Sequence, residues 1–401
     1  MSQRYQGGVL GVGFNPLQAP DVPTSVTAAG GDASATVTFT APTNVGGSAI
    51  TGYTGRSTPD NVAATASASP LTFSGLTNGT SYTFNVWALN SYGPSPAGGP
   101  SGAVSPAAIR GVFGGGNTGS RTNVIDYITI ATTGNATDFG DLTQAFSREA
   151  ACSSATRGLF AGGQDTSDVL LNIIDYITIS SVGNATDFGD LTVARYGPSG
   201  CSSSTRGLFG GGGVASAASN VIDYVTISTT GNATDFGDLT LARGLLGALS
   251  SATRGVWGGG FNSSNQSVNV IDYVTIASAG NATDFGDLTQ IRYALAGCSS
   301  STRGLFGGGY DNILGTLNNI DYITIASAGN ATDFGDLSIA SYALAACSSS
   351  TRGTFGGGAD ASNTNVIGYV TIASTGNATD FGDLTVARQQ VSACSNGHGG
   401  L

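Results

Sequence analysis

Residues 134–143, "GNATDFGDLT", determine how most of this chain is built, because nearly the same ten letters return five more times. The further copies begin at Gly183, Gly231, Gly280, Gly329 and Gly376, and successive starts are 49, 48, 49, 49 and 47 residues apart. Near-identical units at a fixed period indicate a repeat architecture, in which each unit buries its apolar faces only against its neighbours.

Each repeat contains four strand-like segments. Around Arg206 they are "SGCSSS", "RGLFGGG", "NVIDYVTI" and "ATDFGDL". The third is rich in β-branched residues and is bounded by Gly and Asn, as strands between tight turns are. Four strands in a period of about 50 residues predict a six-bladed β-propeller over residues 108–401.

The two ends of the repeat region predict how such a ring would close. The first repeat begins at Arg110 with its second segment and lacks the first. The C-terminal residues "QQVSACSNGHGGL" align with "SGCSSSTRGL" and then stop. We therefore expect the C-terminal strand to complete the first blade, which would leave no open sheet edge.

The order of motifs within a repeat resembles that of kelch-type propellers. The matching features are an Arg after the fourth strand ("LTVAR", ending at Arg195), an apolar strand ending in Gly-Gly ("LFGGG"), a Tyr-bearing strand ("IDY") and an aromatic fourth strand ("TDF"). Phe replaces the Trp that is usual in the fourth strand of that family. The resemblance covers about 290 residues and implies the kelch fold.

Residues 18–107 lack this repeat and show a different pattern of apolar and polar residues. Stretches such as "SATVTFTAP" and "SYTFNVWALN" alternate apolar and polar residues, as half-buried strands do. Tyr82 follows Leu76 by six residues, where sandwich domains place a tyrosine whose hydroxyl ties a loop to a strand. This part resembles a fibronectin type III domain, with Phe39 where that family usually has a buried Trp. The predicted fold class is thus all-β, a sandwich followed by a propeller, and residues 1–17 are predicted to be a flexible Gly-rich arm.

Differences between the repeats are confined to two kinds of link. The links between second and third strands vary, and so do the links from one repeat to the next, whereas the other links hardly change. In an up-and-down blade both variable links emerge on one face, which predicts a binding face. The candidate binding residues are Phe146, Tyr196, Phe261, Asn262, Tyr293, Tyr310, Asp311 and Tyr342. Aromatic rings beside Asn and Asp suit sugar binding; the alternative is neutral drift, with some rings packed between blades.

Composition and charge exclude several classes of function. All 14 basic residues are Arg, and the net charge is −11, which argues against nucleic acid and anionic membrane surfaces as partners. No apolar run is long enough for membrane insertion. The start of the chain has no signal-peptide pattern, so we expect folding in a cytoplasm.

The sequence also offers little for catalysis, so we expect a non-enzymatic protein without cofactors or metals. His398 is the only His and is interpreted as a solvated turn residue. Five Cys share one position of the repeat, where the remaining copy has Leu249, which predicts a buried apolar slot. A calcium site at each "TDFGD" is an alternative to turn capping. The "IDY" Asp could pair with the "RG" arginines.

The combination resembles fibre or appendage proteins of tailed bacteriophages. It implies a virion protein that folds in the host cytoplasm, contacts other virion proteins through its arm and fibronectin-like domain, and binds a host-surface glycan or protein through the variable face. A homo-oligomer is common among fibres, although no coiled-coil heptads are present. The alternatives are a capsid decoration or tail-scaffold protein, a bacterial surface adhesin and a kelch-type intracellular scaffold.

Overall fold

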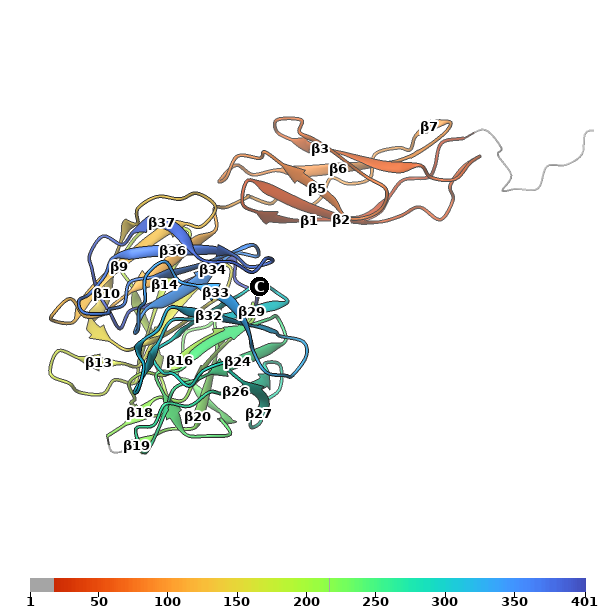
Figure 1. The fold of residues 1–401 in the computed structure, drawn as a ribbon. Coiled ribbons are helices and arrows are strands. Elements are labelled where there is room, and N and C mark those ends of the chain that lie inside the picture. Colours follow the sequence, from red (N-terminus) through yellow and green to blue (C-terminus); the bar gives the residue numbers. More distant parts are fainter. Residues whose placement is uncertain (1–17, 216) are drawn as a thin grey trace, which may run out of the picture. The chain divides into compact units, whose positions relative to one another are not determined.

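The computed structural model describes residues 18–215 and 217–401. The chain divides into two compact units between Ala108 and Ile109 (Figure 1). In the described residues every regular element is a β-strand, so the predicted all-β class is confirmed. None of these residues forms a helix long and apolar enough to cross a membrane. The arm predicted at residues 1–17 lies outside the described residues.

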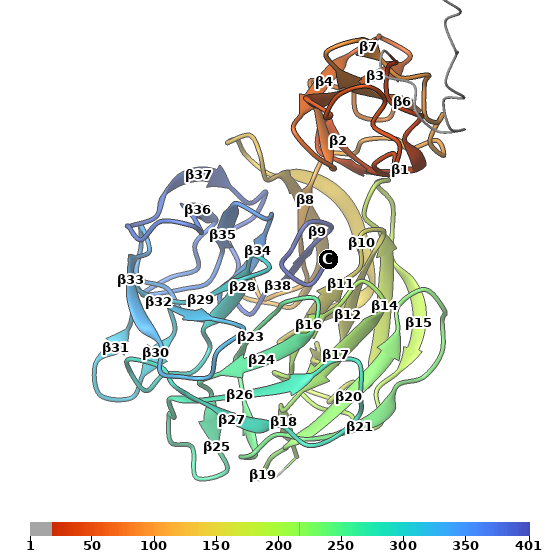
Figure 2. The same cartoon turned by 90° about the vertical axis from the view of Figure 1, so that its right-hand side faces the viewer.

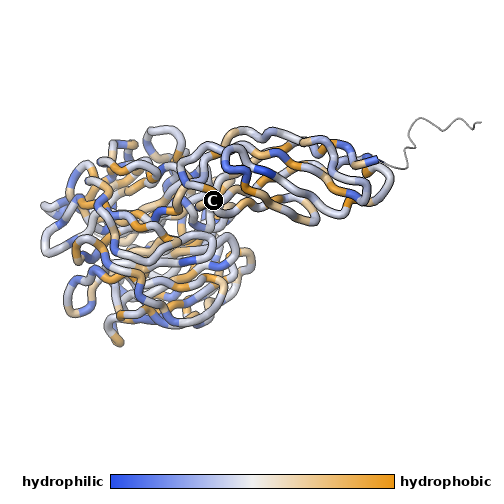
Figure 3. Tube along the Cα trace, turned by 90° about the horizontal axis from the view of Figure 1, so that it is seen from above, coloured by the Kyte–Doolittle hydropathy of each residue, from blue (hydrophilic) through white to orange (hydrophobic). Residues whose placement is uncertain are grey.

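The first unit contains two antiparallel sheets around one core. One sheet has the order β1 (Thr24–Gly31), β2 (Ser34–Thr40), β5 (Leu71–Ser74), and the other has the order β4 (Ala63–Ala66), β3 (Gly52–Thr58), β6 (Thr83–Asn90), β7 (Gly93–Pro94). Alternate residues of β2 and β6 are buried, and Figure 3 shows short hydrophobic segments alternating with hydrophilic ones. Phe39 fills its expected place in the core and contacts Tyr53, with ring centroids 4.7 Å apart.

Tyr82 has the role that its position predicts. Its side chain is fully buried, and its hydroxyl accepts a hydrogen bond from Thr77 N at 3.0 Å. The same hydroxyl donates to Asp60 Oδ2 at 2.5 Å. One buried hydroxyl therefore ties two loops to the strand that begins at Thr83.

The second unit contains six antiparallel sheets of the predicted four strands, each in chain order except the first. The first sheet has β38 (Ser392–Ser395), β8 (Arg110–Gly114), β9 (Thr122–Thr129) and β10 (Thr137–Ser147), with β13 (Gln164–Asp165) added beyond β10. The second has β11 (Ala150–Ser153), β12 (Arg157–Ala161), β14 (Ile173–Thr178) and β15 (Thr186–Asp190). The predicted pairing of the C-terminal strand with the strand after Ile109 is confirmed, because β38 pairs with β8.

The remaining four sheets repeat this pattern. The third has β16 (Ser199–Ser202), β17 (Arg206–Gly210), β20 (Val221–Thr226) and β21 (Thr234–Asp238); the fourth has β23 (Gly247–Ser250), β24 (Arg254–Gly258), β26 (Val270–Thr275) and β27 (Thr283–Asp287). The fifth has β28 (Ala296–Ser299), β29 (Arg303–Gly307), β32 (Asn319–Thr324) and β33 (Thr332–Asp336); the sixth has β34 (Ala345–Ser348), β35 (Arg352–Gly356), β36 (Val366–Thr371) and β37 (Thr379–Asp383). Short two-stranded pairs join β18 (Gly213–Val214) to β19 (Ala217–Ala218), β22 (Arg243–Gly244) to β25 (Phe261–Asn262), and β30 (Tyr310–Asp311) to β31 (Gly315–Thr316).

Serine hydroxyls link the first strands of the six sheets in a closed cycle. Each hydroxyl donates to the carbonyl of the serine in the preceding sheet at 2.6–2.8 Å, and Ser153 donates to Ser395. The members are Ser153, Ser202, Ser250, Ser299, Ser348 and Ser395. Figure 2 shows these first strands nearest to the C-terminus, with the later strands farther out. Each buried hydroxyl also accepts from the backbone N–H of the preceding serine. Every serine hydroxyl of the cycle is therefore both a donor and an acceptor, as buried polar groups usually are.

The "GNATDFGDLT" motif joins the outermost strands of neighbouring sheets. Between the third and fourth sheets, Gly280 N donates to Phe236 O at 2.8 Å and Ala282 N donates to Asp238 O at 2.7 Å. In return, Asp238 N donates to Asn281 Oδ1 at 3.1 Å. The Asn bond recurs at every junction, including Asn135 with Asp383. Each copy of the motif therefore bonds to the outermost strand of the sheet before it, and the first copy bonds to that of the sixth sheet.

Apolar packing also runs between sheets. One core cluster joins Leu208 and Ile222 of the third sheet to Trp257 and Val274 of the fourth. Both faces of each third strand carry buried residues because each sheet lies between two others.

The arginines of each repeat have two different roles. The "RG" arginines lie over the Tyr rings of the third strands, 4.5–4.9 Å from the ring centroids. The hypothesis that they pair with the "IDY" Asp is wrong. Four of the five such Asp residues instead pair with the arginine that precedes their sheet, at 2.9–3.1 Å and with both side chains fully buried. The pairs are Arg195–Asp223, Arg243–Asp272, Arg292–Asp321 and Arg388–Asp126.

Replacing Gly237 by Ala should destabilise the second unit by more than about 2 kcal/mol. Gly237 has φ +146°, and a Cβ there would lie 2.5 Å from Gly280 O, which is backbone and cannot move aside. Gly280→Ala is the matched control, because its Cβ would meet nothing within 4 Å and its φ is outside the left-handed range. Urea unfolding of both variants checks the prediction; equal midpoints would contradict it.

Candidate ligand-binding cavity

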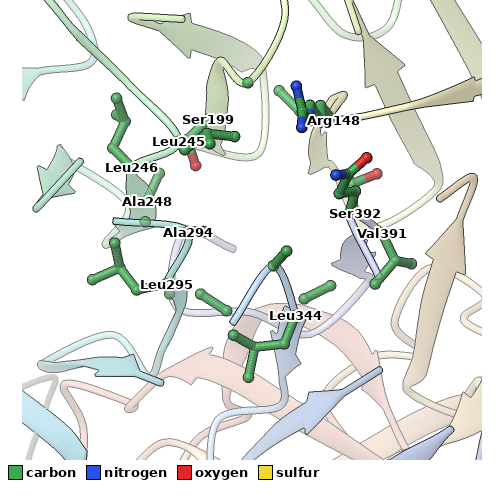
Figure 4. A pocket seen from close by; sticks show the side chains of 18 of the residues that line it. Arg148, Ser199, Leu245, Leu246, Ala248, Ala294, Leu295, Leu344, Val391 and Ser392 are labelled. Carbon is green, nitrogen blue, oxygen red and sulfur yellow. The ribbon is translucent and has the colours of Figure 1, made fainter. Parts of the chain in front are cut away.

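The links that lead into the first strands of the six sheets surround one cavity of about 290 Å³. It is lined by residues from 148–151, 197–200, 245–248, 293–297, 342–346 and 389–393. These are the links from repeat to repeat that vary in sequence. One of the two kinds of variable link therefore surrounds a single hollow (Figure 4), whereas the links between second and third strands do not line it.

A ring of backbone hydrogen bonds, here called the collar, positions these links. Its members are Arg148, Gly197, Leu245, Ala294, Ala343 and Gln390, and each N–H donates to the carbonyl of the preceding member at 2.7–3.1 Å. All six have φ between 52° and 61°, although only one is Gly. A left-handed conformation is unfavourable for residues with a Cβ, and such strain persists where the surrounding structure fixes it, often at functional sites.

The side chains around the cavity include both apolar and polar groups. In Figure 4, Leu245 and Ala294 lie across the cavity from Arg148 and Ser392, with Ser199 beside Leu245 and Val391 beside Ser392. A small-molecule site typically combines such apolar lining with a few polar groups that orient the ligand.

Four of the predicted binding residues form a continuous aromatic run. Ring centroids are 6.0 Å apart for Phe261 and Tyr293, 5.6 Å for Tyr293 and Tyr310, and 5.6 Å for Tyr310 and Tyr342. All four are half-buried, and Tyr293 and Tyr342 line the cavity. Burial, followed by the neighbouring Tyr310 and Tyr342, raises the pKa of Tyr293, so it remains a neutral phenol at physiological pH.

The other predicted residues have different surroundings. Tyr196 is half-buried, and the Arg148 guanidinium carbon lies 5.5 Å from its ring centroid. Asn262 Oδ1 accepts from Ser264 N and Gln266 N, which fixes its own loop. Asp311 is buried and accepts from Ile313 N and Leu314 N in the same way.

The placement of Phe146 on the variable surface is corrected by the structure. Phe146 is fully buried at the end of β10, in the core cluster with Phe139 and Phe160. It occupies the repeat position at which Arg195 and its equivalents stand, so it belongs to the interior between the first two sheets.

Glu149 is a cavity residue that the sequence reasoning missed. It is the only Glu of the chain, and the equivalent residues are Pro198, Leu246, Leu295, Leu344 and Val391. Ser392 Oγ donates to its Oε1 at 3.1 Å, but its buried Oε2 has no partner among the described residues. Burial raises the pKa of Glu149 to about 8, so the carboxyl is mostly protonated at pH 7. Aligning the six links would have revealed this one acidic replacement.

The described residues place no group of three His, Cys, Asp or Glu where it could hold a metal ion. His398 is not a solvated residue: its Nε2 lies 2.9 Å from Ser153 O, and Gly400 N donates to its Nδ1 at 3.0 Å. The five Cys are all buried, as the equivalence with Leu249 predicts, and burial raises the pKa of each thiol. These groups are therefore poorly suited to nucleophilic chemistry.

Comparison with known proteins identifies the first unit. No curated protein matches the chain. The family model of the fibronectin type III domain matches residues 21–103. This range contains both sheets of the sandwich and the Tyr82 hydrogen bonds. Residues 21–103 are a fibronectin type III domain.

Proposed function

We propose that residues 109–401 are a six-bladed kelch-like β-propeller whose central cavity binds a glycan, and that the chain is a non-enzymatic fibre or appendage protein of a tailed bacteriophage. The propeller is supported by the serine cycle and by the Asn bond that recurs at all six junctions between sheets. In this arrangement each sheet is one blade.

The observation that carries the binding function is the convergence of the variable links on the cavity. Constant links could serve assembly alone, whereas links that vary among the repeats and meet at one hollow can recognise an asymmetric ligand. The aromatic run from Phe261 to Tyr342 supports a sugar, because the apolar face of a pyranose can lie on an aromatic ring while its hydroxyls bind nearby polar groups.

The virion part of the proposal rests on the repeated, lysine-free and weakly charged sequence. Under this proposal the fibronectin type III domain is a spacer that contacts other virion proteins. The propeller then meets the host surface.

Glycan binding can be tested with the full-length chain on a glycan array and by titration calorimetry. Replacing Tyr293 and Tyr342 together by Ala should weaken binding of any captured glycan by about tenfold or more, as removal of central aromatic contacts does. Tyr92→Ala is the control, because this exposed tyrosine belongs to the first unit. Absence of any captured glycan, or unchanged affinity in the double variant, would overturn the proposal.

The virion assignment requires a separate experiment. Antibodies against residues 109–401 should place immunogold at the tips of tails or appendages of candidate phage particles. Gold spread over the capsid or tail shaft would indicate a decoration protein, and labelled cell surfaces beside unlabelled particles would indicate an adhesin. Either of these outcomes would contradict an attachment fibre.

A further inference from the structure

We infer that the cavity prefers a sugar that bears a carboxylate and that Arg148 binds this carboxylate. The inference rests on the proposed function, since it names the class of glycan that the same cavity would take. It is carried by Arg148, which lines the cavity and has no salt-bridge partner among the described residues.

Arg148 is held in place by neutral groups. Its Nη1 donates to Gln164 Oε1 at 3.1 Å, and its guanidinium group lies over the Tyr196 ring. In the amide orientation that satisfies the local donors and acceptors, the Gln390 oxygen lies 3.1 Å from Arg148 Nη2 and 3.2 Å from Nε. The side chain is thus oriented on several sides, yet its charge is not neutralised.

The nearby Asp168 favours the charged form of Arg148 but forms no salt bridge with it. Among the residues that the structure describes, none forms a salt bridge with Arg148. Asp168 is paired with Arg121, which adds a second cation to the same neighbourhood. Glu149 follows directly in sequence, but its carboxyl contacts Ser392 and is mostly protonated at pH 7.

An unneutralised cation that is partly removed from water is costly, and burial lowers the pKa of Arg148 accordingly. An anionic ligand group would recover this cost. Arginine binds planar carboxylates through two parallel N–H···O bonds, which gives orientation as well as affinity.

Other residues that line the cavity suit the rest of such a ligand. Tyr293, Tyr342 and Leu245 supply an apolar surface for the face of a sugar ring. A cavity of about 290 Å³ is at the lower end of the range for small-molecule pockets, which favours one terminal sugar unit. Hexuronic acids and nonulosonic acids share this chemistry, so both must be tested.

The test is calorimetry of the full-length chain with methyl glucuronide, methyl glucoside and the methyl glycoside of N-acetylneuraminic acid. At least one acidic sugar should bind about tenfold to a hundredfold more tightly than methyl glucoside. Arg148→Ala should abolish this preference. Ala294 and Ala343 already occupy equivalent collar positions with the same φ, so the variant is expected to fold.

Two further variants sharpen the result. Arg148→Lys keeps the charge but loses the two-pronged geometry, so it should retain only a small part of the preference. Arg56→Ala, in the first unit, should change nothing. Equal binding of acidic and neutral sugars, or a preference that survives in Arg148→Ala, would overturn the inference while leaving glycan binding intact. Failure of every sugar, together with an array that captures none, would overturn the proposed function itself.

Discussion

Replacing Glu149 by Leu is expected to stabilise the second unit by about 3–5 kcal/mol at pH 8 and by only about 1–2 kcal/mol at pH 5. Three of the five equivalent positions already carry Leu. Each of these leucines covers the first positive-φ glycine of the preceding sheet, as Leu295 covers Gly259, and Glu149 covers Gly115 in the same way. Leu therefore fits the slot, and it removes a buried oxygen that has no partner among the described residues.

The pH dependence follows from the raised pKa of Glu149. The carboxyl has an ordinary pKa of 4.5 in the unfolded chain and a pKa of about 8 in the folded one. Between these values the folded state holds a proton that the unfolded state has lost. The free energy of unfolding therefore falls as pH rises from about 4.5 to about 8, by on the order of 4–5 kcal/mol in total. Burial is the main cause, and the nearby Arg388 opposes it.

The measurement is urea unfolding at pH 5 and pH 8, followed by tryptophan fluorescence. In a Trp87→Phe background, Trp257 is the only tryptophan, and its buried indole N–H donates to Ser199 O at 3.0 Å, so it reports on the second unit. Glu149→Gln is the control, because it keeps the size of the side chain and cannot ionise. Both variants should lose the decline in stability with pH. The same decline in Glu149→Leu as in the parent would show that another group causes it.

The repeat made much of the fold predictable. A pattern that returns six times fixes the strand order, and the missing first segment at Arg110 leaves the C-terminal residues as its only candidate. The aromatic positions Tyr293, Tyr310 and Tyr342 are predictable as candidates because they lie in the links that vary between repeats. Their mutual contact depends on how neighbouring sheets are placed, which the spacing in the sequence does not contain.

The errors arose where a residue's partner lies far from it in the sequence. "GNATD" is a tight turn by its composition, but its asparagine accepts a bond from the sheet before it. Asp272 was considered for pairing with an "RG" arginine, whereas its partner is Arg243, 29 residues earlier in the link that enters the same sheet. Phe146 is aromatic and lies beside a variable link, which is typical of a surface binding residue. It is fully buried, however, because it occupies the repeat position at which Arg195 and its buried equivalents stand.

Replacing Asp272 by Ala is expected to destabilise the second unit by about 3–5 kcal/mol, because it leaves a fully buried arginine unpaired. Arg243 would keep only its bonds to Val270 O and Trp257 O, and its Nε already lacks a partner among the described residues. Arg243→Met should cost less than Asp272→Ala. Asp272 keeps the Thr240 hydroxyl at 2.5 Å and can also accept a proton, whereas an arginine cannot lose one at physiological pH.

The chain itself contains both incomplete versions of this pair. Between the fifth and sixth sheets the two positions carry Ser341 and Gly368, so both charges are missing together. Asp175 is retained without an arginine because Phe146 stands in that place; it accepts from Thr143, and burial raises its pKa. In the described residues no arginine of this set is retained without its aspartate.

This asymmetry defines the decisive comparison. The unfolding free energies of Asp272→Ala, Arg243→Met and the double variant form a cycle, and the double variant should be more stable than Asp272→Ala alone. In Arg243→Met, Asp272 keeps its hydrogen bonds from Thr240, as Asp175 keeps those from Thr143. If Asp272→Ala destabilised the second unit less than Arg243→Met, the unpaired buried charge would not be the main cause of the loss of stability. The presence of Asp175 without an arginine would then need an explanation other than protonation.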